Sequence, residues 1–210
     1  MTVHALIVAA GRGTRAGPGG PKQYRTLGGL PVLRRTLQAL RDTGAVDRLR
    51  VVIHPDDAEA YAAAAEGLCL DPPVMGGPTR QDSVRLGLEA LEGADDDLVL
   101  IHDAARPFAD KPLILNVLKA LAHHPGACPA LPVADTLRRV EGPLAGETVP
   151  RDGLARAQTP QGFRLGPIRA AHRPEPLRNN STELLRSLTP RRGLTPSQFA
   201  PSTHTPRRRL

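Results

Sequence analysis

Short apolar runs and amphipathic segments alternate along the first 172 residues of the chain. The apolar runs predict buried strands at residues 4–10, 49–54, 74–75, 97–102 and 127–133. Helical spacing of apolar residues predicts helices from Pro31 to a stop at Gly44, over 57–66 with Asp56 as cap, from Thr79 or Asp82 onward, over 112–123 and over 167–172. This alternation of strand and helix is typical of an α/β fold.

The predicted strands are apolar at nearly every position, rather than at every second one. Strands of that kind are buried on both faces, so we expect a Rossmann-like, mostly parallel sheet between two layers of helices. Ligands bind such sheets at the carboxyl ends of the strands. The segments Gly11–Lys22 and Asp103–Pro107 each follow a strand and are therefore expected at one rim.

Residues 136–151 interrupt the alternation. They are polar and hold turn signals at Glu141-Gly142-Pro143 and at Gly146. We expect two short strands that form an arm projecting from the domain. Pairing of the arm with a second subunit and a solvent-exposed hairpin both fit this pattern.

The positive charge of the chain is concentrated at its end. The net charge is +7, and from Arg173 onward eight Arg stand against two Glu, so residues 1–172 carry about +1. This distribution argues against nucleic-acid binding by the folded part. Residues 173–210 are rich in Pro, Arg, Ser and Thr, and we expect them to be a disordered tail beside a domain of residues 1–172.

The remaining composition favours a cytoplasmic protein. No charged region precedes a long apolar stretch at the N-terminus, and no stretch approaches about 18 apolar residues, so neither a signal peptide nor a membrane span is expected. Cys69 and Cys128 lie far apart without metal-ligand spacing, and we expect small buried thiols in a reducing compartment.

The segment after the first predicted strand has the composition of a phosphate-binding loop. Glycines allow backbone N–H groups to approach an anion, while Arg12, Arg15 and Lys22 supply positive charge. Residues 11–16 match the dinucleotide pattern Gly-x-Gly-x-x-Ala, but Pro18 and Pro21 prevent the helix that this fold requires. The segment is therefore expected to be a long loop that carries cations to a phosphate chain.

Five motifs extend this interpretation, and each has its own place along the chain. They are Ala9-Ala10-Gly11-x-Gly13-x-Arg15 with Pro21-Lys22-Gln23-Tyr24, Arg80-x-x-Ser83-Val84, Ile101-His102-Asp103-Ala104-Ala105-Arg106-Pro107, Leu131-Pro132-Val133-x-Asp135-Thr136 and Ala157-Gln158-Thr159-Pro160-Gln161. In this order they resemble the sugar-phosphate nucleotidyltransferases, and among these the 2-C-methyl-D-erythritol 4-phosphate cytidylyltransferase family.

The resemblance implies an enzyme that transfers CMP from CTP to methylerythritol phosphate with Mg²⁺, in non-mevalonate isoprenoid synthesis. It implies that Arg15 and Lys22 stabilise charge on the α-phosphate, where fixed cations contribute most to catalysis. Asp103 would hold the metal. Contacts to the nucleotide are implied for Ala9, Ala10, Gly11, Gly13, Gly77 and Ser83.

On the acceptor side, the resemblance implies that Arg106 binds the phosphate and that Thr159 lies in the same pocket. Thr136 and Arg151 would complete the pocket of a partner subunit, which implies a homodimer joined through the arm. Simpler interpretations remain open for three of these residues: Ser83 as a helix-start hydroxyl, Asp103 as a turn cap and Arg151 as an ordinary surface arginine. His102 is expected to pack in its strand rather than act as a base, and Arg80 to support its loop.

Beyond residue 172 the sequence departs from the family pattern. The family carries a further strand, an Asn-x-Lys-x-Thr segment and a last helix, whereas residues 173–210 hold no Lys. This change from the family pattern to a Pro-, Arg-, Ser- and Thr-rich sequence suggests a reading-frame shift near residues 173–180. Such a shift would also remove the cyclodiphosphate synthase domain that some members of the family carry downstream. We therefore expect weak or absent turnover.

Three other functions remain open on the sequence. They are a ribitol-phosphate cytidylyltransferase, a nucleotide-binding protein without catalysis, and a nucleic-acid-binding protein that uses the tail arginines. The last is disfavoured because no aromatic residues alternate with those arginines for base stacking.

Overall fold

The computed structural model describes residues 1–12 and 20–173 of the chain. The roles predicted for Gly13 and Arg15 and the disorder predicted for residues 174–210 lie outside these ranges. In the described part, no helix is both long and apolar enough to cross a bilayer.

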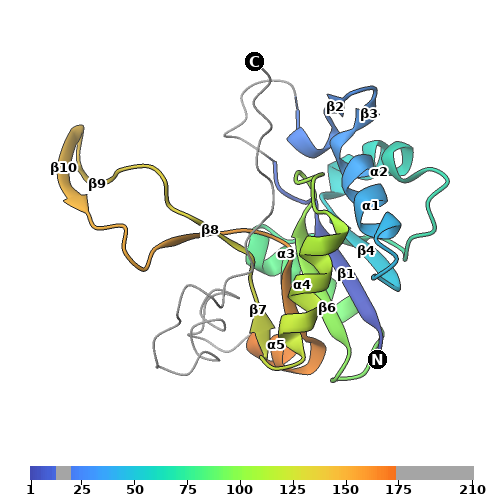
Figure 1. Ribbon diagram of the computed structural model, residues 1–210. Helices are drawn as coiled ribbons and strands as arrows, with labels where there is room; N and C mark the ends of the chain where they lie inside the picture. The colour runs from blue at the N-terminus through green and yellow to red at the C-terminus, as the bar shows by residue number, and fades with distance from the viewer. Residues whose placement is uncertain (13–19, 174–210) are drawn as a thin grey trace, which may run out of the picture.

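The body is a six-stranded sheet with helices on both faces (Figure 1). The strand order is β5-β4-β1-β6-β12-β7. The bounds are β1 Val3–Val8, β4 Arg48–Ile53, β5 Val74–Met75, β6 Leu98–Asp103, β7 Gly126–Ala127 and β12 Gln161–Arg164. The helices are α1 Val32–Asp42, α2 Ala58–Ala65, α3 Arg80–Ala90, α4 Lys111–Leu121 and α5 Leu165–Ala171. Short 3₁₀ turns lie at η2 Lys22–Tyr24 and η3 Pro55–Asp57, and a small hairpin joins β2 Thr26–Leu27 to β3 Leu30–Pro31.

The mostly parallel α/β sheet predicted from the apolar runs is confirmed. β1 pairs in parallel with β4 and with β6, and β4 pairs in parallel with β5. The chain therefore passes outward from β1 to β5 and then returns to β6 on the other side of β1. This change of direction places a topological switch point at the carboxyl ends of β1 and β6, called the crevice below, and such sheets bind ligands at this point.

The predicted strand over residues 127–133 is wrong as a single element. The structure divides it into β7, which pairs antiparallel with β12 in the main sheet, and β8 (Ala130–Pro132), which pairs with β11 (Ala155–Ala157) outside it. β7 and β8 pair with different strands, and the apolar pattern of a segment does not specify which strand it pairs with.

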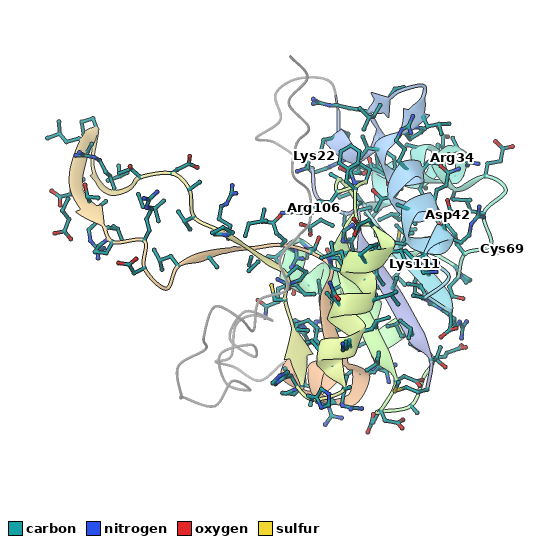
Figure 2. The ribbon with its side chains drawn as sticks, viewed as in Figure 1. Lys22, Arg34, Asp42, Cys69, Arg106 and Lys111 are labelled. Carbon is teal, nitrogen blue, oxygen red and sulfur yellow. The ribbon has the colours of Figure 1, made fainter. Side chains whose placement is uncertain are left out.

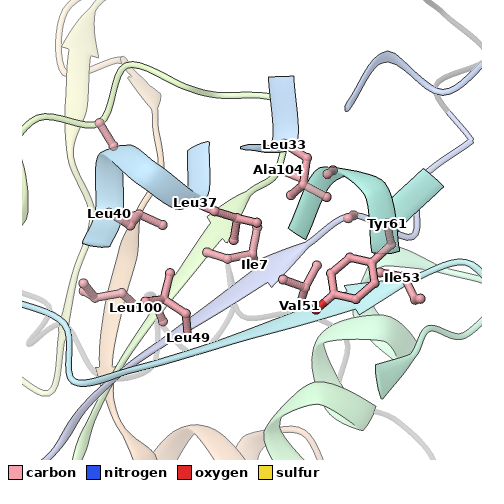
Figure 3. Packing of buried hydrophobic residues seen from close by; sticks show 14 of the residues in the cluster. Ile7, Leu33, Leu37, Leu40, Leu49, Val51, Ile53, Tyr61, Leu100 and Ala104 are labelled. Atoms are coloured by element: carbon pink, nitrogen blue, oxygen red, sulfur yellow. The ribbon is translucent and has the colours of Figure 1, made fainter. Parts of the chain in front are cut away.

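Two hydrophobic cores fill the space on either side of the sheet, and β1 contributes alternately to both. Ala5, Ile7 and Ala9 face the larger core with α1, α2 and α4, while Leu6 and Ala10 face the core under α3 and α5. Figure 3 shows the larger core, in which Leu33, Leu37 and Leu40 of α1 pack over Ile7 and Leu49. The continuous apolar run of β1 follows from this burial on both faces.

Local details correct some of the sequence predictions. Thr79 caps α3, since its hydroxyl oxygen accepts the Asp82 N–H at 3.1 Å. Asp56 does not cap α2, because it lies within η3 and the N-cap position of α2 is Asp57; the Asp56 carboxylate pairs with Arg12. Cys69 is exposed and Cys128 is half-buried, so the expectation of two buried thiols is wrong.

The predicted arm is present as β9 (Leu137–Glu141) and β10 (Leu144–Val149), which form an antiparallel hairpin. Figure 1 shows this hairpin projecting well clear of the body. Val140 and Leu144 are 78% and 70% exposed, so the arm has no core of its own.

Candidate functional site

The crevice between β1 and β6 brings the predicted nucleotide-binding residues together. Val8 and Asp103 are paired in register, so the segments after the two strands start at the same level. The N–H of Ala9 continues the ladder to Val52 at 2.7 Å. Ala9 and Ala10 are buried, whereas Gly11 is exposed at the start of the loop.

The turn between β5 and α3 packs directly on Ala10. A Cβ atom on Gly76 would lie 2.4 Å from the Ala10 Cβ and 2.8 Å from the Ser83 Oγ. A Cβ on Gly77 would lie 2.4 Å from the Asp82 Cβ. Both glycines are therefore required for this close packing, which places Gly77 and Ser83 beside the end of β1.

The Ser83 hydroxyl is engaged within its own turn. It accepts the Gly77 N–H at 3.2 Å and lies 2.9 Å from the Thr79 carbonyl oxygen, to which it donates. Ser83 is 2% exposed. The Ser83 side chain thus stabilises the Gly76-Gly77 turn, and its contact to the nucleotide stays a prediction.

Gln23 ties the two ends of the loop together, a role that the sequence analysis missed. Its side-chain amide donates to the Ala9 carbonyl at 2.6 Å and to the Gly11 carbonyl at 3.0 Å. Gln23 is 3% exposed and directly follows Lys22, which is exposed at the start of η2. The clamp therefore fixes the position of the Lys22 backbone relative to the end of β1. The one sequence feature that could have indicated this role is the position of Gln23 next to Lys22 in the Pro21-Lys22-Gln23-Tyr24 motif.

Arg12, at the start of the loop, does not face an open phosphate site. It forms ion pairs with Asp56 and, at 3.2 Å, with Asp57. Its charge is therefore neutralised within the fold, and Lys22 is the better candidate for phosphate contact.

Asp103 ends β6 between two guanidinium groups. Its oxygens accept from Arg80 Nη2 at 3.1 Å and from Arg106 Nε at 3.0 Å. Burial alone raises the pKa of the Asp103 carboxyl, but the charges and hydrogen bonds of Arg80 and Arg106 outweigh it and bring the pKa below its ordinary value. Asp103 is therefore an anion at neutral pH. Arg80 supports the segment as expected.

Arg106 is oriented by its own neighbours. Besides its bond to Asp103, its Nη1 donates to the Gln158 Oε1 at 2.6 Å. Figure 2 shows Lys22 and Arg106 near the same upper edge of the body. A hollow of about 370 Å³ opens beside Arg106 and is walled by mostly apolar residues of the α4 start and of β8, among them Phe108, Leu113 and Leu131.

Thr159 lies at the same rim, with its hydroxyl turned inward. The hydroxyl meets the His102 ring at 2.9 Å and accepts the Asp103 N–H at 3.3 Å. His102 itself is completely buried, as expected for a strand residue. The structure thus brings Thr159 together with Asp103 and Arg106.

Thr136 and Arg151 are not part of this cluster. They flank the arm, and within the described ranges no hydrogen bond or ion pair links either of them to Asp103 or Arg106. Arg151 instead donates to the Ala134 carbonyl at the base of the arm.

A metal ion would find one carboxylate here rather than a preformed cage. No group of three or more His, Cys, Asp or Glu side chains gathers as a metal site within residues 1–12 and 20–173. Mg²⁺ is commonly held by one or two carboxylates together with substrate phosphates. The ionised Asp103 fits this requirement, since each of its oxygens accepts one hydrogen bond from a described residue and retains a lone pair.

Fold and site together define a Rossmann-like α/β protein with a lysine, a carboxylate and two arginines at the carboxyl ends of β1 and β6. Comparison with known families narrows this class. The family model described as 2-C-methyl-D-erythritol 4-phosphate cytidylyltransferase (IspD) matches residues 3–184. The chain belongs to this family.

Individual relatives agree. The chain is 54% identical, over 179 residues, to a protein of Cereibacter sphaeroides strain KD131 named 2-C-methyl-D-erythritol 4-phosphate cytidylyltransferase, with 84% of this chain and 79% of that one covered. It is 59% identical to a protein of Rhodospirillum rubrum named bifunctional enzyme IspD/IspF, with 81% of this chain but only 45% of that protein covered. The chain thus spans less than half the length of its bifunctional relatives.

Solved structures support the fold assignment. A crystal structure titled 4-diphosphocytidyl-2C-methyl-D-erythritol synthase matches with a TM-score of 0.75 at 33% identity, covering 90% of this chain and 86% of that one. The cytidylyltransferase structure from Thermus thermophilus matches with a TM-score of 0.68 at 35% identity, covering 87% and 83%.

Proposed function

We propose that the chain transfers CMP from CTP to 2-C-methyl-D-erythritol 4-phosphate and releases pyrophosphate. Family membership across residues 3–184 supports the reaction type. The observation that carries the proposal is the pair of contacts at the carboxyl ends of β1 and β6, where Ala10 meets the Gly76-Gly77 turn and Asp103 meets Arg106. A nucleotide and an acceptor phosphate would occupy the two sides of the crevice.

In the proposed reaction an oxygen of the acceptor phosphate attacks the α-phosphorus of CTP. The bond from the α-phosphorus to the bridging oxygen breaks, and pyrophosphate leaves with the electron pair. The acceptor is already an anionic nucleophile, so no general base is required. The barrier arises from repulsion between anions, and fixed cations are therefore the main catalytic contribution.

Lys22 and Arg106 are the described cations assigned to that contribution. Lys22 is exposed and has no acidic partner within the described residues, so its ammonium group is available to the α-phosphate. Arg106 would bind the acceptor phosphate, which a guanidinium recognises through paired N–H groups. Arg15 is assigned to the α-phosphate by family resemblance alone.

Mg²⁺ completes the proposal, with Asp103 as its protein ligand and nucleotide phosphate oxygens as the others. When bound, the ion would neutralise negative charge on the phosphates.

A homodimer through the arm is also part of the proposal. A two-stranded hairpin by itself is marginally stable, and the β9–β10 hairpin exposes Val140 and Leu144 without a core. A second copy would cover these side chains and bring Thr136 and Arg151 to its own crevice. Substituting Val140→Glu together with Leu144→Glu should convert the dimer to a monomer in light scattering. A wild-type monomer would contradict the dimer proposal.

A cytoplasmic location is part of the proposal as well. The unpaired Cys69 and Cys128 support a reducing compartment.

Pyrophosphate release from CTP tests the function directly. We expect turnover with 2-C-methyl-D-erythritol 4-phosphate and little with ribitol 5-phosphate, and preference for CTP over the other nucleoside triphosphates. Faster turnover with ribitol phosphate would reassign the acceptor. CTP-dependent thermal stabilisation without turnover would indicate a binding protein. The weak or absent turnover expected because the sequence departs from the family pattern beyond residue 172 stays a prediction. The rate of pyrophosphate release measures it.

A further inference from the structure

His102 occupies a central position beneath the acceptor side of the crevice. It is the penultimate residue of β6 and is completely buried. Its Nε2 lies 2.9 Å from the Arg106 carbonyl oxygen, and its Nδ1 lies 2.9 Å from the Thr159 Oγ1. A buried imidazole with both nitrogens engaged in this way connects the Arg106 turn to Thr159, which lies 57 residues from His102 along the chain.

The partners determine which nitrogen carries the proton. A backbone carbonyl only accepts hydrogen bonds, so Nε2 must be the N–H that donates to Arg106. The Thr159 hydroxyl accepts the Asp103 N–H at 3.3 Å, which leaves its own proton for His102 Nδ1. Every donor in this network then has an acceptor, and the neutral ring in the Nε2–H form satisfies all of them.

This hydrogen-bond network is complete only with a neutral ring. An imidazolium would place a second N–H against the Thr159 hydroxyl and would displace its proton from the network.

The network acts on the residue assigned to the acceptor phosphate. Arg106 is held at four points: its N–H by the Asp103 carbonyl, its own carbonyl by His102, its Nε by the Asp103 carboxylate and its Nη1 by Gln158. His102 is the member that reaches no solvent and joins the Arg106 turn to the Thr159 turn. Without it, the Arg106 backbone carbonyl would lose its connection through the imidazole to Thr159.

We propose that His102, in its Nε2–H form, is a positioning residue that couples Thr159 to Arg106 and so presents the Arg106 guanidinium to the acceptor phosphate. This inference rests on the proposed function for the identity of the acceptor. It gives Thr159 a role in holding the turn, with its hydroxyl proton committed to His102.

The kinetic test compares His102→Leu, Thr159→Val and Thr159→Ser with the wild type. Loss of a buried hydrogen-bond partner should raise the KM for the sugar phosphate or lower its kcat/KM by about tenfold or more in His102→Leu and Thr159→Val, while the KM for CTP changes less than about twofold. Thr159→Ser keeps the hydroxyl and should recover most of the activity. His172→Leu is the matched control, because it removes another buried ring outside the site. The His172 Nε2 makes no hydrogen bond within the described residues, so this variant should change neither KM.

A double-mutant cycle separates positioning from general destabilisation. In an Arg106→Ala background, His102→Leu should reduce kcat/KM for the sugar phosphate by less than about twofold further, because its effect acts through Arg106. Additive effects, or equal changes in both KM values, would overturn the proposal.

Nitrogen NMR of the wild-type ring provides a test that needs no turnover. The His102 spectrum should show a protonated Nε2 and an unprotonated Nδ1 at pH 7, and Thr159→Val should shift Nδ1 selectively. An Nδ1–H form or an imidazolium at pH 7 would refute the network even in an active enzyme. Absent turnover with the predicted NMR signature would instead refute the proposed function alone.

Discussion

The clamp formed by Gln23 leads to the most specific prediction of this structure. Gln23→Met keeps the length of the side chain and removes both N–H donors. The Ala9 carbonyl is buried and would lose its partner, at a cost of about 1–3 kcal/mol, while the exposed Gly11 carbonyl would regain water at a cost below about 1 kcal/mol. We therefore expect the free energy of unfolding to fall by about 2–3 kcal/mol.

The effect on turnover should exceed what stability alone explains. Gln23 adjoins Lys22, so release of the clamp frees the backbone that carries the proposed α-phosphate cation. A displacement of about 1 Å at a catalytic group can cost about 100-fold in rate. We expect kcat to fall about 10- to 100-fold at a temperature where the variant remains folded.

Urea unfolding and pyrophosphate release together measure both effects. Gln38→Met on α1 is the matched control, because this half-buried side chain makes no hydrogen bond within the described residues. In a Lys22→Met background, Gln23→Met should lower kcat little further, since the group that it positions is gone. A destabilised Gln23→Met variant with wild-type kcat, or full additivity with Lys22→Met, would refute this reasoning.

Three further predictions concern the site and its surroundings. Gly76→Ala should lower the free energy of unfolding by about 1–3 kcal/mol and weaken CTP binding in calorimetry, because the new Cβ would lie 2.4 Å from that of Ala10. An unchanged affinity for CTP would contradict the close packing. The free energy of unfolding should fall as pH decreases below about 6.5, because the pKa of His102 in the folded chain lies below the value of 6.5 in the unfolded chain, so the unfolded state binds more protons. In urea titrations from pH 8 to 5.5, the plot of unfolding free energy against pH should have a shallower slope for His102→Leu than for the wild type. Equal slopes would exclude this contribution. Chelation by EDTA should abolish pyrophosphate release and Mg²⁺ should restore it, whereas Asp103→Asn should need higher Mg²⁺; full activity in EDTA would exclude the metal.

The sequence by itself determined the class of fold and the place of the crevice. Continuous apolar runs such as that of β1 are a local property, and they imply burial on both faces whatever the neighbours are. The glycines and prolines after β1 likewise exclude a helix at that point, because backbone freedom and a missing N–H are properties of single residues. The family motifs then identified Lys22, Asp103 and Arg106 as the residues to examine.

Only the tertiary structure decided which groups are partners. Gln23 reaches back across the loop, Arg12 meets Asp56 and Asp57, and His102 joins Arg106 to Thr159 across 57 residues. The apolar pattern likewise does not specify partner strands, so it predicted residues 127–133 as one strand, whereas the structure divides them between β7 and β8. A hydrophobic pattern records whether a side chain is buried, whereas a hydrogen bond depends on which distant group arrives opposite it, and that is set by the packing of the whole sheet.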